Sequence, residues 1–185
     1  MKYPDLSLGQ IEAIVNRLGG IEGAMSFLRD ERVLQEKQTS RGSFSIHIDY
    51  SQSLADMIKA GKYDWKNDDI TEKRFPLKGK GSVEHTVHLL HYDRVMTSVD
   101  VITAMDVAGQ EPALIEDLLA FGAKYPEEQR KYPIIALGSS AGVRGSRRVP
   151  CLDGFGSLRS LHLDWFDYGW LEQCRFLARN KVSAT

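Results

Sequence analysis

The sequence lacks three features that each define a large class of proteins: many cysteines, a long apolar segment and an excess of charge of one sign. Two cysteines in 185 residues are too few for the disulfide framework of a small secreted domain. There is no run of about 18 apolar residues and no apolar signal-peptide core near the N-terminus, so we expect a cytoplasmic chain without membrane association. The 24 basic and 25 acidic residues give a net charge of -1, which excludes a whole-chain field that would attract nucleic acid or anionic lipid.

The composition is otherwise that of an ordinary globular protein. Hydrophobic residues make up 42% and charged residues 26% of the chain, which suffices for a sizeable core and excludes wholesale disorder. Cys151 and Cys174 have neither a CxxC motif nor a histidine close to them in the sequence. In a reducing compartment we therefore expect two buried thiols, rather than a disulfide or a pair of metal ligands.

The first 32 residues have the spacing of two short helices. Apolar residues three and four positions apart predict helices over residues 6–18 and 21–32, and a Gly-Gly pair separates them. The two helices form either an αα-hairpin packed on the body or a helix-turn-helix. The second predicted helix carries mixed charges rather than a basic face for reading bases, which favours the hairpin.

Strands and one helix are expected between this pair and Met96. Residues 33–50 are expected to be strand, because apolar and polar residues alternate over residues 44–49, and residues 83–92 are also strand-like. Residues 53–60 predict a short helix that ends at Gly61.

The part of the chain after Met96 is marked more clearly by caps and glycines. Thr97 and Asp100 resemble a capping box at the start of a helix. A second amphipathic helix has Pro112 in its first turn and ends at Gly122. Four short strand-like runs follow, over residues 134–137, 148–152, 158–165 and 174–178.

Two helices followed by an antiparallel meander are typical of the α+β class. We expect a domain boundary near Met96. Residues 1–96 then form an N-terminal region of helices and strands, and residues 97–185 form a second domain.

Three histidines, His85, His88 and His91, recur at intervals of three residues. On a helix they would share a face and could bind a metal ion, but their apolar neighbours predict a strand. Successive strand residues point to opposite faces, so His88 faces away from the other two. His47 could add a ligand only if its strand pairs alongside, and we expect no metal site here.

A glycine-rich stretch, residues 138–145, precedes a small basic patch. Residues 138–159 hold four arginines against Asp153, a local charge of +3. Backbone donors in such a loop can hold phosphate, but no GK[ST] or GxGxxG spacing is present, so an ordinary turn is favoured. With few interleaved aromatic residues, the patch gives little support for nucleic-acid binding.

Four segments, in this order, resemble a compact C-type-lectin-like domain: PALIEDLLAFGAKYP, IIALGSSAG, RRVPCLDGFGSLRSLHLDWFD and CRFLARN. The resemblance covers residues 97–181, and the last segment also resembles the closing strand of the formylglycine-generating and sulfatase-modifying group. Residues 49–65, DYSQSLADMIKAGKYDW, are similar to a segment of uncharacterised bacterial proteins. The resemblance implies a lectin-like fold for the second half of the chain.

Lectin-like relatives include the variable proteins of diversity-generating retroelements, which use this fold as a rigid scaffold and vary side chains near its C-terminal end. The resemblance implies a ligand-binding face in the turns around the last two strands. It places there Asp164, Phe166, Asp167, Tyr168, Trp170, Glu172 and Gln173, with Arg144, Arg147 and Phe155 on neighbouring loops.

Other activities of the group lack their motifs in this sequence. Neither a Glu-Pro-Asn nor a Trp-Asn-Asp sugar motif is present, so calcium-dependent sugar binding is not expected. Cys151 and Cys174 fall in predicted strands and do not correspond to the catalytic cysteine pair of the formylglycine-generating enzymes. We expect a non-enzymatic module, with no cofactor, that binds a protein or other macromolecular ligand. The alternative is a metal-dependent enzyme or a nucleic-acid-associated factor that uses the histidines or the arginine-rich loop.

Overall fold

The computed structural model describes residues 7–17, 20–28 and 39–181. Contacts divide the chain into two compact units, Met1–Glu36 and Lys37–Thr185. The first unit contains α1 (Leu8–Arg17) and α2 (Gly20–Leu28), which contact each other. Both predicted N-terminal helices are therefore present, and the end of the second prediction, residues 29–32, lies outside the described residues.

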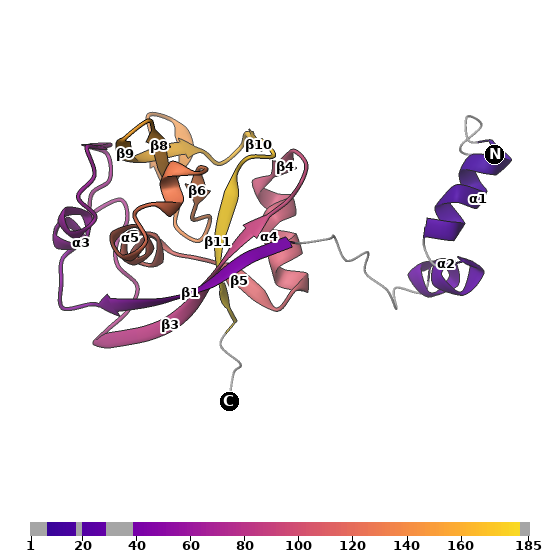
Figure 1. Cartoon of the computed structure of the whole chain (residues 1–185), viewed down its shortest axis with the longest axis horizontal. Coiled ribbons are helices and arrows are strands. Elements are labelled where there is room, and N and C mark those ends of the chain that lie inside the picture. The colour runs from indigo at the N-terminus through magenta and orange to yellow at the C-terminus, as the bar shows by residue number, and fades with distance from the viewer. Residues whose placement is uncertain (1–6, 18–19, 29–38, 182–185) are drawn as a thin grey trace. The chain divides into compact units, whose positions relative to one another are not determined.

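The second unit is built on a nine-stranded, mostly antiparallel sheet (Figure 1). Its main path runs in the order β1 (Thr39–Asp49), β3 (Ser82–His91), β11 (Arg175–Asn180), β6 (Ile134–Ile135), β8 (Ser146–Phe155), β9 (Leu158–Trp165) and β2 (Trp65–Lys66). Two short strands lie off this path: β5 (Gln110–Pro112) pairs with β11, and β7 (Ala141–Val143) pairs with β8. The pairs β6–β11 and β2–β9 are parallel. A separate two-stranded sheet joins β4 (Met96–Thr97) to β10 (Gly169–Trp170).

Three α-helices and one 3-10 helix accompany the sheet: α3 (Leu54–Ala60), α4 (Ser98–Val107), α5 (Ile115–Lys124) and η1 (Glu128–Arg130). The capping box predicted at the start of α4 is confirmed, because Thr97 Oγ1 accepts from the Asp100 N–H at 3.1 Å and the Asp100 carboxylate accepts from the Thr97 N–H at 3.4 Å. Ser53 and Asp56 make the same box at α3, which ends at Gly61 as predicted.

Alternate strand residues enter two buried clusters on opposite faces of the sheet. Ile134 and Leu177 belong to the cluster that also holds the apolar residues of α3 and α5. Ile135 and Phe176, their neighbours along the chain, belong to the cluster that holds the apolar residues of α4. The result is a sheet between helices on both faces, and the predicted α+β class is confirmed. No helix among the described residues is long and apolar enough to cross a membrane.

The sheet joins strands from both sides of the expected domain boundary. β3 precedes Met96, yet it pairs along its length with β11, where His91 lies opposite Arg175 and Val87 opposite Arg179. The division into compact units falls after Glu36 instead. Residues 39–180 therefore share one sheet and two continuous cores, and sequence spacing alone did not reveal this long-range pairing.

Two details of the predicted second helix are wrong. Pro112 lies in β5, opposite Ala178, instead of in the first helical turn. Gly122 does not end the helix, which continues to Lys124. Gly122 is required for close packing: a Cβ there would lie 2.4 Å from the Tyr63 Oη.

Gly138 permits a close approach of two backbone segments, which gives a prediction. Its N–H donates to the Ala113 carbonyl, and a Cβ at this position would lie 2.5 Å from the Pro112 carbonyl oxygen and 2.6 Å from that of Ala113. We expect Gly138→Ala to lower the free energy of unfolding by about 2–3 kcal/mol, because backbone cannot yield as a flexible side chain can. Denaturant unfolding of this variant and of Gly142→Ala makes the comparison.

Gly142, four residues later in β7, is the matched control, since a Cβ there meets nothing within 4 Å. Gly142→Ala should leave the unfolding midpoint nearly unchanged. Equal midpoints for the two variants would contradict the assigned packing of Gly138.

Candidate functional site

The chain turns sharply where β9 ends, and an exposed aromatic stack lies at this turn. The rings of Trp165 and Tyr168 are stacked, with centroids 5.1 Å apart and an interplanar angle of 16°. Arg148 lies opposite Trp165 in the β8–β9 register, and its guanidinium is 3.6 Å from the centre of the indole. Trp165 is 38% and Tyr168 61% exposed. We call Arg148, Trp165 and Tyr168 the aromatic turn.

Two aromatic residues of the predicted binding face are buried instead. Phe166 and Trp170 pack in the buried cluster that holds the apolar residues of α4. The Trp170 indole N–H donates to Ser98 Oγ at 2.8 Å, and Ser98 Oγ donates to the Phe166 carbonyl at 2.6 Å. β9 ends at Trp165, so the alternation of the strand does not decide which residues of the following turn are exposed. The expectation that Phe166 and Trp170 are displayed to a ligand is therefore corrected: they anchor the turn.

The predicted loop residues do not form one face. Phe155 is exposed, but it pairs with Leu158 at one end of the β8–β9 hairpin, whereas Arg148 and Trp165 pair at the other. Seven residues of strand separate the two ends by about 23 Å. Phe155 consequently lies too far away to contact a small ligand held at the aromatic turn.

The two predicted arginines are held by local contacts. The Arg147 guanidinium lies 3.6 Å from the centre of the Phe166 ring, and its Nε donates to Ser140 Oγ. Arg144 adopts a left-handed φ of 49° in the turn between β7 and β8, where it lines a hollow with Asp68 and Asp69. Arg147 is thus adjacent to the aromatic turn, and Arg144 faces an acidic loop.

A hollow of about 210 Å³ is lined on one side by Tyr168 of the aromatic turn, and we call it the turn pocket. Its polar side chains are Asp153, His162, Asp164, Tyr168 and Gln173. Three of these, Asp164, Tyr168 and Gln173, were predicted from the sequence. Asp167 and Glu172, also predicted, are exposed and do not line it.

The register of the β8–β9 hairpin explains how the pocket forms. His162 lies directly opposite Cys151, and Asp153 lies opposite Ser160. Since residues two apart on a strand share a face, Asp153, His162 and Asp164 all project from one face of the hairpin. The distance from His162 Nε2 to Asp153 Oδ2 is 3.9 Å. His162 Nε2 is buried and has no hydrogen-bond partner among the described residues.

The two cysteines at the base of the pocket are free and buried, which confirms the expected thiols. Burial, together with the nearby carboxylates of Asp153 and Asp164, raises the pKa of Cys151 well above its usual value. Burial also raises the pKa of Cys174 to about 11. Both groups are therefore protonated at neutral pH, which disfavours a role as nucleophile or as metal ligand.

The three histidines at intervals of three residues have separate partners. His85 Nε2 bonds to Asp117 Oδ1 at 2.7 Å, and His88 Nδ1 bonds to Ser43 Oγ at 3.1 Å. His91 Nε2 donates to the Glu172 carbonyl at 2.9 Å. In the described part of the chain, no three His, Cys, Asp or Glu side chains are grouped so as to hold a metal ion.

His85 belongs to a polar cluster that the sequence did not predict. Its partner Asp117 is fully buried at the start of α5, and the Arg179 guanidinium lies 3.7 Å from Asp117 Oδ2. A hollow of about 390 Å³, the His85 cavity, is lined by Tyr50, His85 and Arg179. Burial first, and then the charges of Glu116 and Asp117, raise the pKa of Tyr50 to about 12. The sequence signal was the acidic pair 116–117 in a helical first turn, but nothing local connected it to His85.

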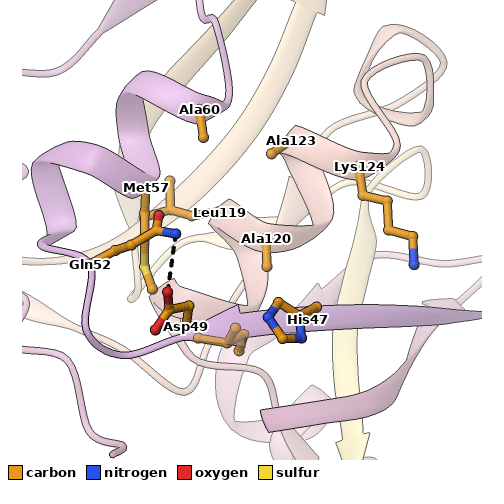
Figure 2. Close-up of a pocket in the computed structure, with 10 residues that line it drawn as sticks. His47, Asp49, Gln52, Met57, Ala60, Leu119, Ala120, Ala123 and Lys124 are labelled. Carbon is orange, nitrogen blue, oxygen red and sulfur yellow. Dashed lines mark hydrogen bonds between the residues drawn. The ribbon is translucent and has the colours of Figure 1, made fainter. Parts of the chain in front are cut away.

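A third hollow, of about 320 Å³, lies between β1, α3 and α5 (Figure 2). Its walls include Ala60, Ala120 and Ala123, with polar side chains at the rim. Asp49 accepts from Ser51 and more weakly from Gln52, at 3.5 Å, and the hydrogen bonds from Ser51 lower the pKa of Asp49. Asp49 therefore stays ionised with part of its hydrogen-bonding capacity already used by its neighbours, while the alanine walls offer apolar contact.

Comparisons with protein-family models, curated proteins and solved structures find no significant match to this chain. Its function is therefore inferred from its side chains and surfaces.

Proposed function

We propose that the chain is a non-enzymatic binding module that contacts a protein or other macromolecular partner through the aromatic turn. The observation that carries the proposal is the exposed stack of Trp165 and Tyr168 with Arg148. Tryptophan, tyrosine and arginine are the residues that most often dominate binding energy at interfaces. Stiff rings also lose little conformational entropy when they bind.

Contacts with the core hold the aromatic turn in place, which favours binding without large rearrangement. The Phe166 N–H donates to the Arg147 carbonyl at 3.0 Å, and Trp170 pairs with Met96 in the two-stranded sheet. Both ends of the turn are therefore held by the core, while Tyr168 stays exposed. Such preorganisation reduces the entropy that binding must overcome.

The proposal includes a lectin-like scaffold over residues 97–181, and it is supported by the order of the four sequence motifs. It also includes a cytoplasmic location and, as in variable proteins, diversification of the displayed turn. A reverse transcriptase gene beside a near-identical copy of the 3′ end would support diversification. Their absence from the locus would remove that part of the proposal and leave the binding turn itself unaffected.

The binding proposal predicts that removing the stacked rings weakens binding at least tenfold. Peptides selected on the wild-type chain from a random displayed library are the ligands, and their Kd values are measured by titration. Trp165→Ala/Tyr168→Ala should reduce affinity by this amount because hot-spot truncations cost about 2 kcal/mol or more. Near-UV and far-UV circular dichroism establish that the variant is folded.

Phe155→Ala provides the matched control, since Phe155 is an exposed ring at the far end of the same hairpin. It should change the same Kd values less than twofold. Failure to select any ligand, or equal losses for the two variants, would overturn the proposal.

A second candidate function, an acid–base enzyme, is favoured by one observation at His85. The Asp117 carboxylate accepts from Nε2, and Nδ1 has no hydrogen-bond partner within the described residues. Because an ionised carboxylate can only accept, the proton sits on Nε2 and leaves Nδ1 as a base. Hydrolysis of p-nitrophenyl acetate should then fall about tenfold in His85→Gln and little in His47→Gln. Equal rates for the two variants would remove this candidate.

A further inference from the structure

We propose that the turn pocket binds an organic cation: the ammonium or guanidinium group of a basic side chain or of a small amine. This inference rests on the proposed binding function, since Tyr168 belongs both to the aromatic turn and to the lining of the pocket. It adds the chemical class of the group that the turn selects. The grounds are the charge, the aromatic walls and the hydrogen-bond acceptors of the pocket.

The charge of the lining is negative. Asp153 and Asp164 contribute two carboxylates, and no described lysine or arginine side chain lines the hollow. Arg175 does not line the hollow, but its guanidinium lies 4.5 Å from the centre of the Tyr132 ring and donates to the carbonyls of the lining residues Gln173 and Cys174, so one positive charge lies beside a lining that holds two carboxylates. The same two carboxylates contribute to the raised pKa values of the thiols beneath them. A cation is the ligand that this field favours.

Aromatic rings provide the second contact that a cation needs. Tyr168 and Trp170 both line the pocket. The Trp170 indole N–H is already bonded to Ser98 Oγ, so it is not available to the pocket as a donor. A cation near the face of tryptophan or tyrosine gains from about 0.5 to 2 kcal/mol, the larger value where water is excluded. Carboxylates combined with ring faces are suited to an organic cation rather than to a compact hydrated one.

The acceptors match a group with several N–H donors. His162 lies two residues before Asp164 on β9, and Asp153 projects from the same face on the neighbouring strand β8. The buried Nε2 of His162 has no hydrogen-bond partner among the described residues. A neutral imidazole nitrogen can accept one N–H, and the carboxylates can accept the others. Guanidinium carries five N–H donors and ammonium three. A ligand of this kind would satisfy the His162 nitrogen that the chain itself leaves unpaired.

The size and spacing exclude two other kinds of ligand. A volume of about 210 Å³ is below the range of roughly 300–1,000 Å³ that holds drug-sized molecules. It therefore suits a head group rather than a whole cofactor. A metal site is disfavoured because no three His, Cys, Asp or Glu side chains of the described residues are grouped so as to hold a metal ion.

The test uses Nα-acetyl-arginine amide and the corresponding lysine amide as free probes, with the neutral isostere Nα-acetyl-citrulline amide as the control. Binding to the full chain is measured by calorimetry and by ¹H–¹⁵N chemical shifts. We expect the arginine or lysine amide to bind with shifts centred on His162 and Gln173, and citrulline amide to bind at least tenfold more weakly. Asp164→Asn should weaken the cationic probe at least tenfold.

Asp167→Asn is the matched control variant, because Asp167 is an exposed acid in the same turn that does not line the pocket. It should alter the affinity less than twofold. No saturable binding of either cationic probe, equal binding of citrulline amide, or equal losses in the two variants would overturn the inference. Displacement of the probe by Mg²⁺ or Zn²⁺ at equal concentration would also overturn it, in favour of a metal site.

A further affinity measurement distinguishes a cationic side chain of a macromolecular partner from a free amine. A seven-residue peptide with one central arginine that binds at least tenfold more tightly than the free amide indicates a macromolecular partner, and equal affinities indicate a free amine. The failure of this inference remains distinguishable from failure of the proposed function. Peptides selected without lysine or arginine would still lose affinity on Trp165→Ala, which removes a ring of the stack that does not line the pocket.

Discussion

Replacing Arg159 with methionine is expected to lower the free energy of unfolding by about 3–5 kcal/mol. Arg159 is only 6% exposed. Its Nη1 donates to the Gly61 carbonyl at 2.7 Å, its Nη2 to the Gly122 carbonyl at 2.6 Å, and its Nε and Nη2 to Gln129 Oε1 at 3.2 and 2.9 Å. Within the described chain, no carboxylate forms an ion pair with its guanidinium.

Helix ends take the place of a carboxylate partner. Gly61 is the C-cap of α3, and Gly122 lies in the last turn of α5. The carbonyl of Gly122 would normally accept from the residue four positions later, which is Pro126 and has no N–H. Arg159 supplies that missing donor, and its positive charge sits at the negative ends of two helix dipoles. Methionine would leave three buried acceptors unpaired, each at a cost of about 1–3 kcal/mol.

Denaturant unfolding monitored by tryptophan fluorescence measures this loss. Arg159→Lys should recover only part of it, because one ammonium cannot reach all three acceptors in the geometry of the planar fork. Arg144→Met, at an exposed arginine, should change stability by less than about 0.5 kcal/mol. A methionine variant within about 1 kcal/mol of the wild type would contradict the role assigned to Arg159.

Asp117→Ala is expected to destabilise the chain by about 3–5 kcal/mol, since it removes one partner from a fully buried charged cluster. Asp117 Oδ2 accepts from the Leu114 N–H at 2.7 Å, and Oδ1 bonds to His85 at 2.7 Å. Leu114, the N-cap of α5, has no side-chain acceptor of its own. The alanine variant therefore leaves a backbone donor, an imidazole N–H and part of the Arg179 charge without their acceptor.

Asp100→Ala is the matched control, because Asp100 occupies the same helical position in α4 as Asp117 does in α5. Asp100 is also the third residue of its helix and also bonds back to the N-cap N–H, but it is exposed. Its loss should cost only about 1 kcal/mol. Chemical unfolding of both variants at neutral pH gives the comparison. Similar losses for the two would show that the contacts of Asp117 with His85 and Arg179 contribute little.

Local signals predicted the elements well where one segment determines its own structure. The Thr97 cap, the Gly61 stop and the strand over residues 158–165 each depend on residues close together in the sequence. Pro112 was misplaced because its structure depends on pairing with Ala178, far along the chain. The boundary expected near Met96 depends in the same way on the pairing of β3 with β11, which has no local signature.

The sequence predicted only part of the candidate site, because the rest of the site also depends on long-range strand pairing. The C-terminal turn is rich in aromatic residues, so its composition was visible, but which rings are exposed depends on the residue at which β9 ends. Asp153 and His162 were missed because their common face follows from the hairpin register, with Phe155 opposite Leu158 across Gly156 and Ser157. A two-residue turn beginning with a left-handed glycine could have set that register from sequence.

The position of β11 in the middle of the sheet has a consequence for how the chain folds during synthesis. β3 and β6 both pair with β11, so the sheet consists of two half-sheets until that strand is made. Each half-sheet then presents an open edge of unpaired backbone groups, which invites pairing with other chains. Contacts between segments so far apart in sequence also slow folding. Loss of the residues from Arg175 onward would therefore separate the two halves of the sheet, whereas loss of an edge strand such as β2 would only shorten it.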